Sequence, residues 1–102
     1  MAFQRVTSLT EFWSGEKIGL TLGGKRIVLV NVDGAVYAYE DACPHLGLAL
    51  SEGELKGTRL TCRGHLWEYD ACTGRGINPA TIHLKPLPVR VERDDVLVDP
   101  DV

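Results

Sequence analysis

The chain has 102 residues, a length that fits a single domain with a modest core. Hydrophobic residues make up 44% and charged residues 25%, proportions typical of globular proteins and unlike those of disordered, collagenous or membrane-spanning chains. The net charge of −3 argues against a nucleic-acid partner, which normally meets a basic face. No stretch approaches the roughly 20 apolar residues of a membrane span, and the first residues lack the pattern of a secretory leader, so we expect a cytoplasmic protein.

The amino-terminal part predicts one short helix. Ser8, followed three residues later by Glu11, has the pattern of a capping box, in which the two side chains satisfy backbone N–H groups reciprocally. A brief helix over residues 8–13 is therefore expected, ended by a Ser-Gly pair. We expect Trp13, at the end of this segment, to belong to the core.

Strand patterns dominate the two ends of the chain. Residues 17–22 read as a strand, and residues 26–40 are two β-rich runs around Asp33-Gly34, a dipeptide typical of hairpin turns. Residues 89–98 repeat this pattern, with residues 93–95 as the turn. In the first arm of this second hairpin apolar and charged residues alternate, which is typical of a sheet with one wet face.

The middle of the chain differs from its ends. From residue 41 to about residue 84 it is rich in Gly, Pro, Cys and His, with short strand-like pieces at residues 59–62 and 66–69. Loops of this length in a small domain are usually functional. After them, Pro86 and Pro88 favour an edge strand over a central one, because proline donates no backbone hydrogen bond. The sequence predicts an antiparallel β-scaffold that carries a site built from loops.

Two cysteine–histidine pairs lie in these loops. Cys43 and His45 are two residues apart, Cys62 and His65 are three apart, and sixteen residues separate the pairs. Each pair offers one thiolate and one imidazole. A [2Fe–2S] core that binds two cysteines on one iron and two histidines on the other requires this set of ligands. The glycines beside the ligands would let backbone N–H groups approach the sulfides.

Other interpretations use the same residues. A structural zinc site also takes Cys₂His₂. Zinc modules, however, usually have two to four residues between paired ligands, whereas Cys43 and His45 have one residue between them. The pattern also contains no finger helix. A cysteine nucleophile beside histidine requires fewer residues than are present. All four residues would also be compatible with ordinary burial, but their placement in glycine-rich loops makes this the weakest interpretation.

The two pairs and their surroundings resemble the signature of Rieske proteins, Cys-x-His followed by Cys-x-x-His. The resemblance is strongest from about residue 41 to residue 79. Residues 50–53 (Leu-Ser-Glu-Gly) and residues 74–79 (Gly-Arg-Gly-Ile-Asn-Pro) look like the ferredoxins of bacterial toluene and alkene monooxygenases. The ferredoxins of ring-hydroxylating dioxygenases are similar in length and outline.

The resemblance implies an all-β Rieske fold in a single domain over residues 1–102. Its base would be an antiparallel sheet structure of residues 1–40 and 85–102. A loop-rich cluster-binding subdomain of about residues 41–84 would be inserted in this base. One [2Fe–2S] cluster is the implied cofactor.

The resemblance also assigns roles to the ligands and their neighbours. Cys43 and Cys62 would hold the buried iron, and His45 and His65 would hold the outer iron through ring nitrogens. Residues 76–79 would form a third loop over the cluster.

The chain departs from the respiratory Rieske proteins at three positions. Those proteins have a disulfide between the ligand loops, where this chain has Leu48 and Gly64, and a serine that donates to a sulfide, where this chain has Trp67. Fewer hydroxyl donors leave more negative charge on the cluster. Rieske potentials span roughly −150 to +300 mV, and we expect the low end, near about −150 mV.

Three further residues lie outside the ligand set. Cys72 is expected to be an incidental thiol in the turn at residues 70–74, because it belongs to neither ligand pair. His83 is expected to be a surface or packing histidine. Trp67 is expected to anchor the core of the cluster subdomain, with shielding of the cluster or a place at the docking face as the alternative.

The resemblance implies a one-electron carrier without turnover of its own. It would take electrons from an NADH-dependent flavin or iron–sulfur reductase and pass them to the oxygenase component of an aromatic or alkene monooxygenase. A ring-hydroxylating dioxygenase is the alternative client, and a zinc-stabilised binding module is the alternative from another class. We expect a monomer that docks weakly and transiently around Leu46, Trp67 and Pro79.

Overall fold

The computed structural model describes residues 3–41, 50–62, 67–78 and 83–100. In this part of the chain the elements are short strands and one 3₁₀ turn. They are β1 (Gln4–Ser8), β2 (Lys17–Leu22), β3 (Lys25–Val32), β4 (Ala35–Glu40), η1 (Leu50–Glu52), β5 (Glu54–Lys56), β6 (Arg59–Thr61), β7 (Glu68–Asp70), β8 (Gly76–Asn78), β9 (Pro86–Leu87), β10 (Val89–Glu92) and β11 (Asp95–Val98). The expected all-β architecture is confirmed. Among the described residues, none belongs to a helix with the length and apolar character needed to cross a membrane.

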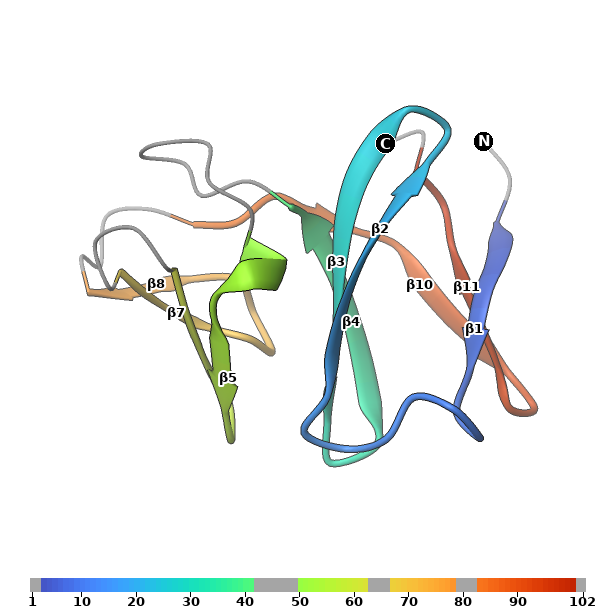
Figure 1. Ribbon diagram of the computed structural model, residues 1–102, viewed down its shortest axis with the longest axis horizontal. Coiled ribbons are helices and arrows are strands. Elements are labelled where there is room, and N and C mark those ends of the chain that lie inside the picture. The colour runs from blue at the N-terminus through green and yellow to red at the C-terminus, as the bar shows by residue number, and fades with distance from the viewer. Residues whose placement is uncertain (1–2, 42–49, 63–66, 79–82, 101–102) are drawn as a thin grey trace.

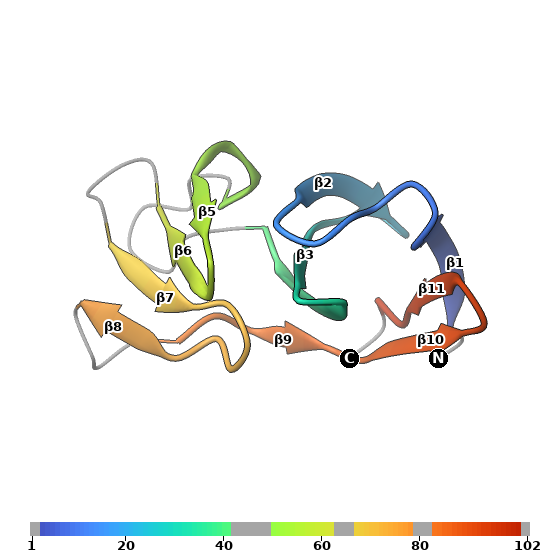
Figure 2. The ribbon, with the colours of Figure 1, turned by 90° about the horizontal axis from the view of Figure 1, so that it is seen from below.

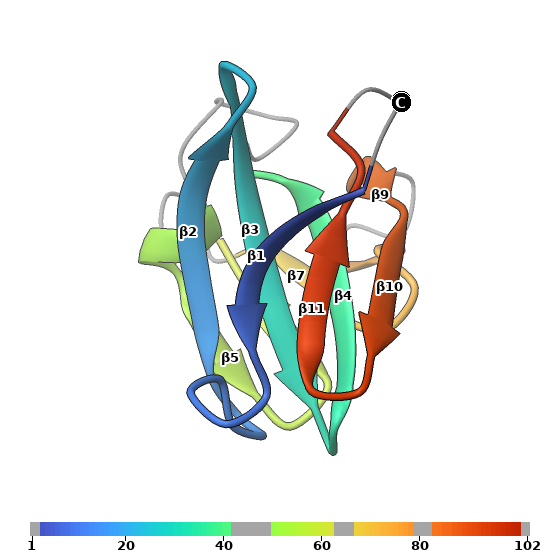
Figure 3. The same ribbon diagram turned by 90° about the vertical axis from the view of Figure 1, so that its right-hand side faces the viewer.

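The strands form three antiparallel sheets that lie side by side along the longest axis of the molecule (Figure 1). The first sheet has the order β1-β11-β10, the second β2-β3-β4-β9 and the third β5-β6-β7-β8. Seen from below, the second sheet stands between the other two (Figure 2). Figure 3 looks onto the first sheet, with β2, β3 and β4 behind it.

The central strand β3 is buried along most of its length because both of its faces are covered. Ile27 and Leu29 face a core cluster shared with the first sheet, which includes Phe12, Val96 and Val98. The alternate residues of β3 face a second cluster. It is shared with the third sheet and is made of Val28, Val30, Val32, Tyr39, Leu50, Leu60, Cys62, Tyr69, Ala71 and Leu84. A strand with two covered faces reads as a continuous apolar run, as β3 does.

Both hairpins expected at the ends of the chain are present. Asp33 and Gly34 have φ values of 53° and 89°. Positive φ at both central positions matches the right-handed twist of the flanking strands, which explains the Asp-Gly pair. The second hairpin has a two-residue turn with φ of 58° at Arg93, so β11 begins at Asp95, one residue earlier than expected. Pro86 lies on β9, an edge strand, as expected.

The expected helix over residues 8–13 is wrong. Ser8 ends β1, and its carbonyl accepts the backbone N–H groups of Glu11 and Phe12, both at 2.9 Å, so the segment is a single hydrogen-bonded turn. The Ser8 hydroxyl accepts the N–H of Thr10 at 3.2 Å, whereas the expected capping box would have it accept the N–H of Glu11. One turn without further propagation is unstable as a helix, and here the chain is needed to cross from the first sheet to the second.

The expected burial of Trp13 is also wrong. The Trp13 side chain is 66% exposed, whereas its neighbour Phe12 is 1% exposed and occupies the core between the first two sheets. The indole N–H of Trp13 donates to the carbonyl of Thr10 at 3.0 Å. Adjacent residues of a tight turn point in different directions, so only one of the two aromatic rings can enter the core.

The third sheet is larger than the sequence indicates. Strand pieces are expected at residues 59–62 and 66–69, and these correspond to β6 and β7. The structure adds β5 and β8 on either side, which makes a four-stranded antiparallel meander. The division into a base and an inserted unit of about residues 41–84 stays a prediction.

Candidate metal centre

The third sheet gathers the ends of several chain segments along one edge. Because the sheet is an antiparallel meander, the start of β5, the end of β6, the start of β7 and the end of β8 lie in one row. The paired residues of this row are Glu54, Thr61, Glu68 and Asn78. Three segments lead to or from this sheet: 42–49 precedes η1 and β5, 63–66 joins β6 to β7, and 79–82 follows β8. Together they contain three of the four expected ligands.

Cys62 directly follows β6 at this row. Its side chain is 1% exposed and belongs to the core cluster between the second and third sheets. It forms no disulfide. The backbone N–H of Cys62 donates to the carbonyl of Trp67 at 2.7 Å, which extends the pairing of β6 with β7 to these two residues. Trp67 is partly buried against the same core cluster, as expected for an anchor.

A close backbone contact holds the start of β5 against the end of β6. A Cβ atom added at Gly53 would lie 2.0 Å from the carbonyl oxygen of Thr61, a distance that no side chain tolerates. The Gly53 N–H donates to the carbonyl of Leu50 at 2.9 Å, and Leu50 is buried in the core cluster. Residues 50–53 therefore bring the chain from segment 42–49 directly to Cys62.

Asp41 and Ser51, which lie on either side of segment 42–49, are hydrogen-bonded to each other. Both carboxylate oxygens of Asp41 accept hydrogen bonds from Ser51, one from the backbone N–H at 2.8 Å and one from the hydroxyl at 2.6 Å. Neither residue is among the site residues expected from the sequence. An acidic residue before the first ligand pair and a serine after it were visible, but nothing in their spacing of ten indicates that they meet.

Three of the four expected ligands, Cys43, His45 and His65, lie outside the described residues. Within the residues that the structure describes, no group of three or more His, Cys, Asp or Glu side chains is placed to hold a metal ion. His83 is exposed and pairs through its backbone with Arg75, in agreement with its expected surface role.

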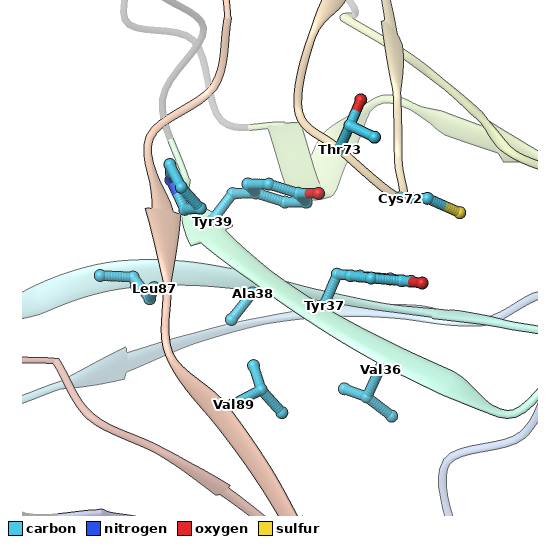
Figure 4. Close-up of a pocket in the computed structure, with 9 residues that line it drawn as sticks. Val36, Tyr37, Ala38, Tyr39, Cys72, Thr73, Leu87 and Val89 are labelled. Atoms are coloured by element: carbon cyan, nitrogen blue, oxygen red, sulfur yellow. The ribbon is translucent and has the colours of Figure 1, made fainter.

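Cys72 lies apart from this row, in the turn after β7. The hydroxyl of Tyr37 is hydrogen-bonded to its thiol, and this contact raises the pKa of Tyr37 above its usual 10.0. Figure 4 shows both side chains at a shallow cleft of about 290 Å³, which is lined by Val36, Tyr37, Ala38, Tyr39, Cys72, Thr73, Pro86, Leu87 and Val89. None of the other residues that line this cleft is a cysteine, a histidine or a carboxylate.

The described part of the site fits an iron–sulfur cluster. Cys62 is a cysteine outside any disulfide, buried at a sheet edge where three connecting segments are anchored. Thiolate and imidazole are the ligands of a Rieske centre, and the chain offers two of each within or directly beside two of these segments.

Comparison with known proteins supports this assignment. The Rieske [2Fe-2S] domain family matches residues 2–88. The chain is 36% identical over 93 residues to the ferredoxin component of the naphthalene 1,2-dioxygenase system of Pseudomonas aeruginosa, covering 90% of this chain and 89% of that protein. It is 35% identical over 94 residues to the ferredoxin component of the alkene monooxygenase system of Xanthobacter autotrophicus, covering 91% and 77%.

A solved structure agrees with the sequence relatives. The chain superimposes with a TM-score of 0.86 on a chain of the complex of reduced oxygenase and oxidized ferredoxin in carbazole 1,9a-dioxygenase. The two are 28% identical, and the match covers 94% of this chain and 91% of the other.

The chain therefore belongs to the Rieske [2Fe–2S] proteins, and within them to the ferredoxin components of bacterial multicomponent oxygenases. The expected Rieske fold, the [2Fe–2S] cluster and the role of electron carrier are confirmed. The zinc-stabilised module is thereby set aside, because the family that matches binds an iron–sulfur cluster.

Proposed function

We propose that this ferredoxin carries single electrons from an NADH-dependent flavin or iron–sulfur reductase to the terminal oxygenase of an aromatic-ring-hydroxylating dioxygenase. Its cluster is held by Cys43, His45, Cys62 and His65. The observation that carries the proposal is the similarity to dioxygenase ferredoxins over nine-tenths of the chain, together with a buried Cys62 at the edge where the connecting segments are anchored.

The cluster supplies reversible one-electron chemistry, and the protein supplies its position and surroundings. The core cluster around Leu50, Leu60 and Tyr69 excludes water from the Cys62 side of the site. The short strands β5 to β8 hold the ends of the connecting segments at fixed spacing. If the cysteine-bound iron is buried and both histidines face the surface, electrons would pass to a docked partner through the histidines.

The choice of client rests on the relatives. The expectation from the sequence is a monooxygenase, with a dioxygenase as the alternative. The ferredoxins of naphthalene 1,2-dioxygenase and biphenyl 2,3-dioxygenase systems favour the dioxygenase. The alkene monooxygenase ferredoxin, at 35% identity, supports the monooxygenase as a second candidate.

One apolar surface residue supports docking near the site. Ile77 lies on β8 directly before Asn78, the residue of β8 that belongs to the row, and Ile77 is 42% exposed. Small, partly apolar surfaces suit transient electron-transfer partners, whose interfaces are among the smallest known. Of the other residues expected at the docking face, Leu46 and Pro79 lie outside the described residues, and Trp67 is partly buried.

The ligand set is tested by serine substitution at the two cysteines that the structure describes. Cys62→Ser should abolish the visible absorption and the EPR signal of a Rieske cluster. Cys72→Ser, the matched control, should leave both unchanged and bind the same amounts of iron and labile sulfide. A normal Rieske spectrum in Cys62→Ser would refute the ligand assignment.

The client is tested by reconstitution. The ferredoxin is combined with NADH, a dioxygenase-system reductase and the terminal oxygenase of either a naphthalene dioxygenase or an alkene monooxygenase, and product is measured. We expect faster product formation with the dioxygenase. Faster turnover with the monooxygenase hydroxylase would favour the second candidate, and no turnover with either would refute both.

A further inference from the structure

The base of segment 42–49 is closed by a buried carboxylate. The Asp41 side chain has no exposed surface, and its two oxygens accept the Ser51 N–H at 2.8 Å and the Ser51 hydroxyl at 2.6 Å. Hydrogen bonds to an ionised carboxylate are stronger than those between neutral groups. Asp41 and Ser51 therefore fix the distance between the two ends of the segment.

Two cations and the backbone of the central sheet complete this base. The guanidinium of Arg26 lies 3.5 Å from the Asp41 carboxylate, and the Asp41 N–H donates to the carbonyl of Arg26 at 3.0 Å. The ammonium group of Lys17 donates to the carbonyl of Ser51. The residues on either side of segment 42–49 are thus tied to strands of the second sheet, Asp41 to β3 and Ser51 to β2.

Gly19 makes the approach of Ser51 possible. A Cβ atom at this position of β2 would lie 2.6 Å from both Cβ and Oγ of Ser51, and 3.2 Å from a carboxylate oxygen of Asp41. The φ of Gly19 lies outside the left-handed range, so the close approach of Ser51 alone explains the glycine. Any side chain here would push Ser51 away from Asp41.

We propose that Gly19, Asp41 and Ser51 form a clasp that positions the first ligand pair. The clasp holds Asp41 and Ser51, the residues on either side of segment 42–49, together independently of the metal, and this would lower the entropy that cluster binding has to overcome. Closing a loop costs conformational entropy, and a loop that is already closed binds its cluster more tightly. This inference rests on the ligand set proposed above.

Gly19→Ala tests the clasp in the cluster-containing protein without altering Asp41 or Ser51. We expect the cluster to bleach about tenfold faster or more in excess iron chelator, as loss of a hydrogen bond to a charged group implies. The Ser51 amide should exchange faster with solvent, and the reduced-state EPR lines should broaden because the ligands adopt more orientations. In a Ser51→Gly background, where the obstructing atoms are gone, Gly19→Ala should have little further effect.

Asn31→Ala is the control for general destabilisation. The Asn31 side chain is buried on the other face of β3, where it donates to the carbonyl of Phe12 at 2.9 Å and accepts the N–H of Gly34 at 2.9 Å. This variant should lower the melting temperature and leave the EPR line widths unchanged. The clasp would be overturned if Gly19→Ala and Asn31→Ala showed the same relation between bleaching rate and melting temperature. It would also be overturned if Gly19→Ala had the same effect in wild type and in the Ser51→Gly background.

The ligand set is tested separately from the clasp. Cys43→Ser and His45→Ala should each lose the Rieske spectrum, while the Ser51 amide stays protected because the clasp does not include them. A retained spectrum would overturn the ligand set. Loss of Ser51 protection in these variants would overturn the clasp, because closure would then depend on the cluster.

Discussion

Removing one buried hydroxyl should weaken the joint between the second and third sheets. Tyr39 lies on β4 and is almost fully buried, and its hydroxyl donates to the carbonyl of Ala71 at 2.7 Å. In Tyr39→Phe that buried carbonyl loses this donor, which costs about 1–3 kcal/mol of unfolding free energy. For a domain of this size the melting temperature should fall by about 4–8 °C for each kcal/mol.

The same hydroxyl predicts a pH dependence. Burial, followed by the nearby Cys72, Asp70 and Tyr37, raises the pKa of Tyr39 above its usual 10.0. The folded protein therefore keeps a proton that the unfolded chain releases near pH 10. The stability is fully present below pH 10 and is lost as the pH rises from there toward the folded pKa, by about 1.4 kcal/mol per pH unit.

The assay is the midpoint of urea unfolding of the cluster-containing protein, followed by far-UV circular dichroism from pH 7 to pH 11. Wild type should exceed Tyr39→Phe in stability at pH 7, and its advantage should shrink above pH 10. Tyr37→Phe is the control. The Tyr37 hydroxyl is hydrogen-bonded to the partly exposed thiol of Cys72, so its removal should lower the unfolding free energy by less. Equal stability of wild type and Tyr39→Phe at pH 7, or a constant difference up to pH 11, would refute the reasoning.

Two further predictions concern packing. Gly53→Ala should lower the urea midpoint and the cluster content, because the new Cβ would lie 2.0 Å from a carbonyl oxygen of β6. Gly57→Ala is the control: its Cβ would meet no atom and its φ is +59°, so the substitution should lower the unfolding free energy by only about 1–2 kcal/mol. Equal losses in the two variants would contradict the clash at Gly53. Phe12→Ala should destabilise by about 3–5 kcal/mol, whereas Trp13→Ala should stay within about 0.5 kcal/mol of wild type. A large loss in the thermal melt of Trp13→Ala would mean that this ring is buried in solution.

Local patterns predicted the parts of the fold that depend on neighbouring residues. The Asp33-Gly34 turn and the second hairpin were predictable because turn conformation depends on a few adjacent residues. The edge position of Pro86 follows from its missing N–H. The expected helix failed because a capping pattern starts a turn without ensuring that it propagates, and Ser8 was already part of β1.

The candidate site divides in the same way. The spacing of the cysteines and histidines indicated the cluster, which the family match confirms, because ligand type and number are properties of the residues themselves. The assignment of the four ligands stays a prediction, because Cys62 is the one expected ligand that lies within the described part of the chain. The contact of Asp41 with Ser51 was not predictable, since it depends on a glycine in another strand.

The sequence by itself determined the class of cofactor, the all-β character and the position of the hairpins. Only the tertiary structure decided which of two adjacent aromatic rings is buried, how four short strands align their ends in one row, and that the Asp41 carboxylate meets Ser51. The physical reason is the range of the interactions involved. Turn conformation and ligand chemistry reside in adjacent residues, whereas burial and loop closure depend on surfaces supplied by distant strands.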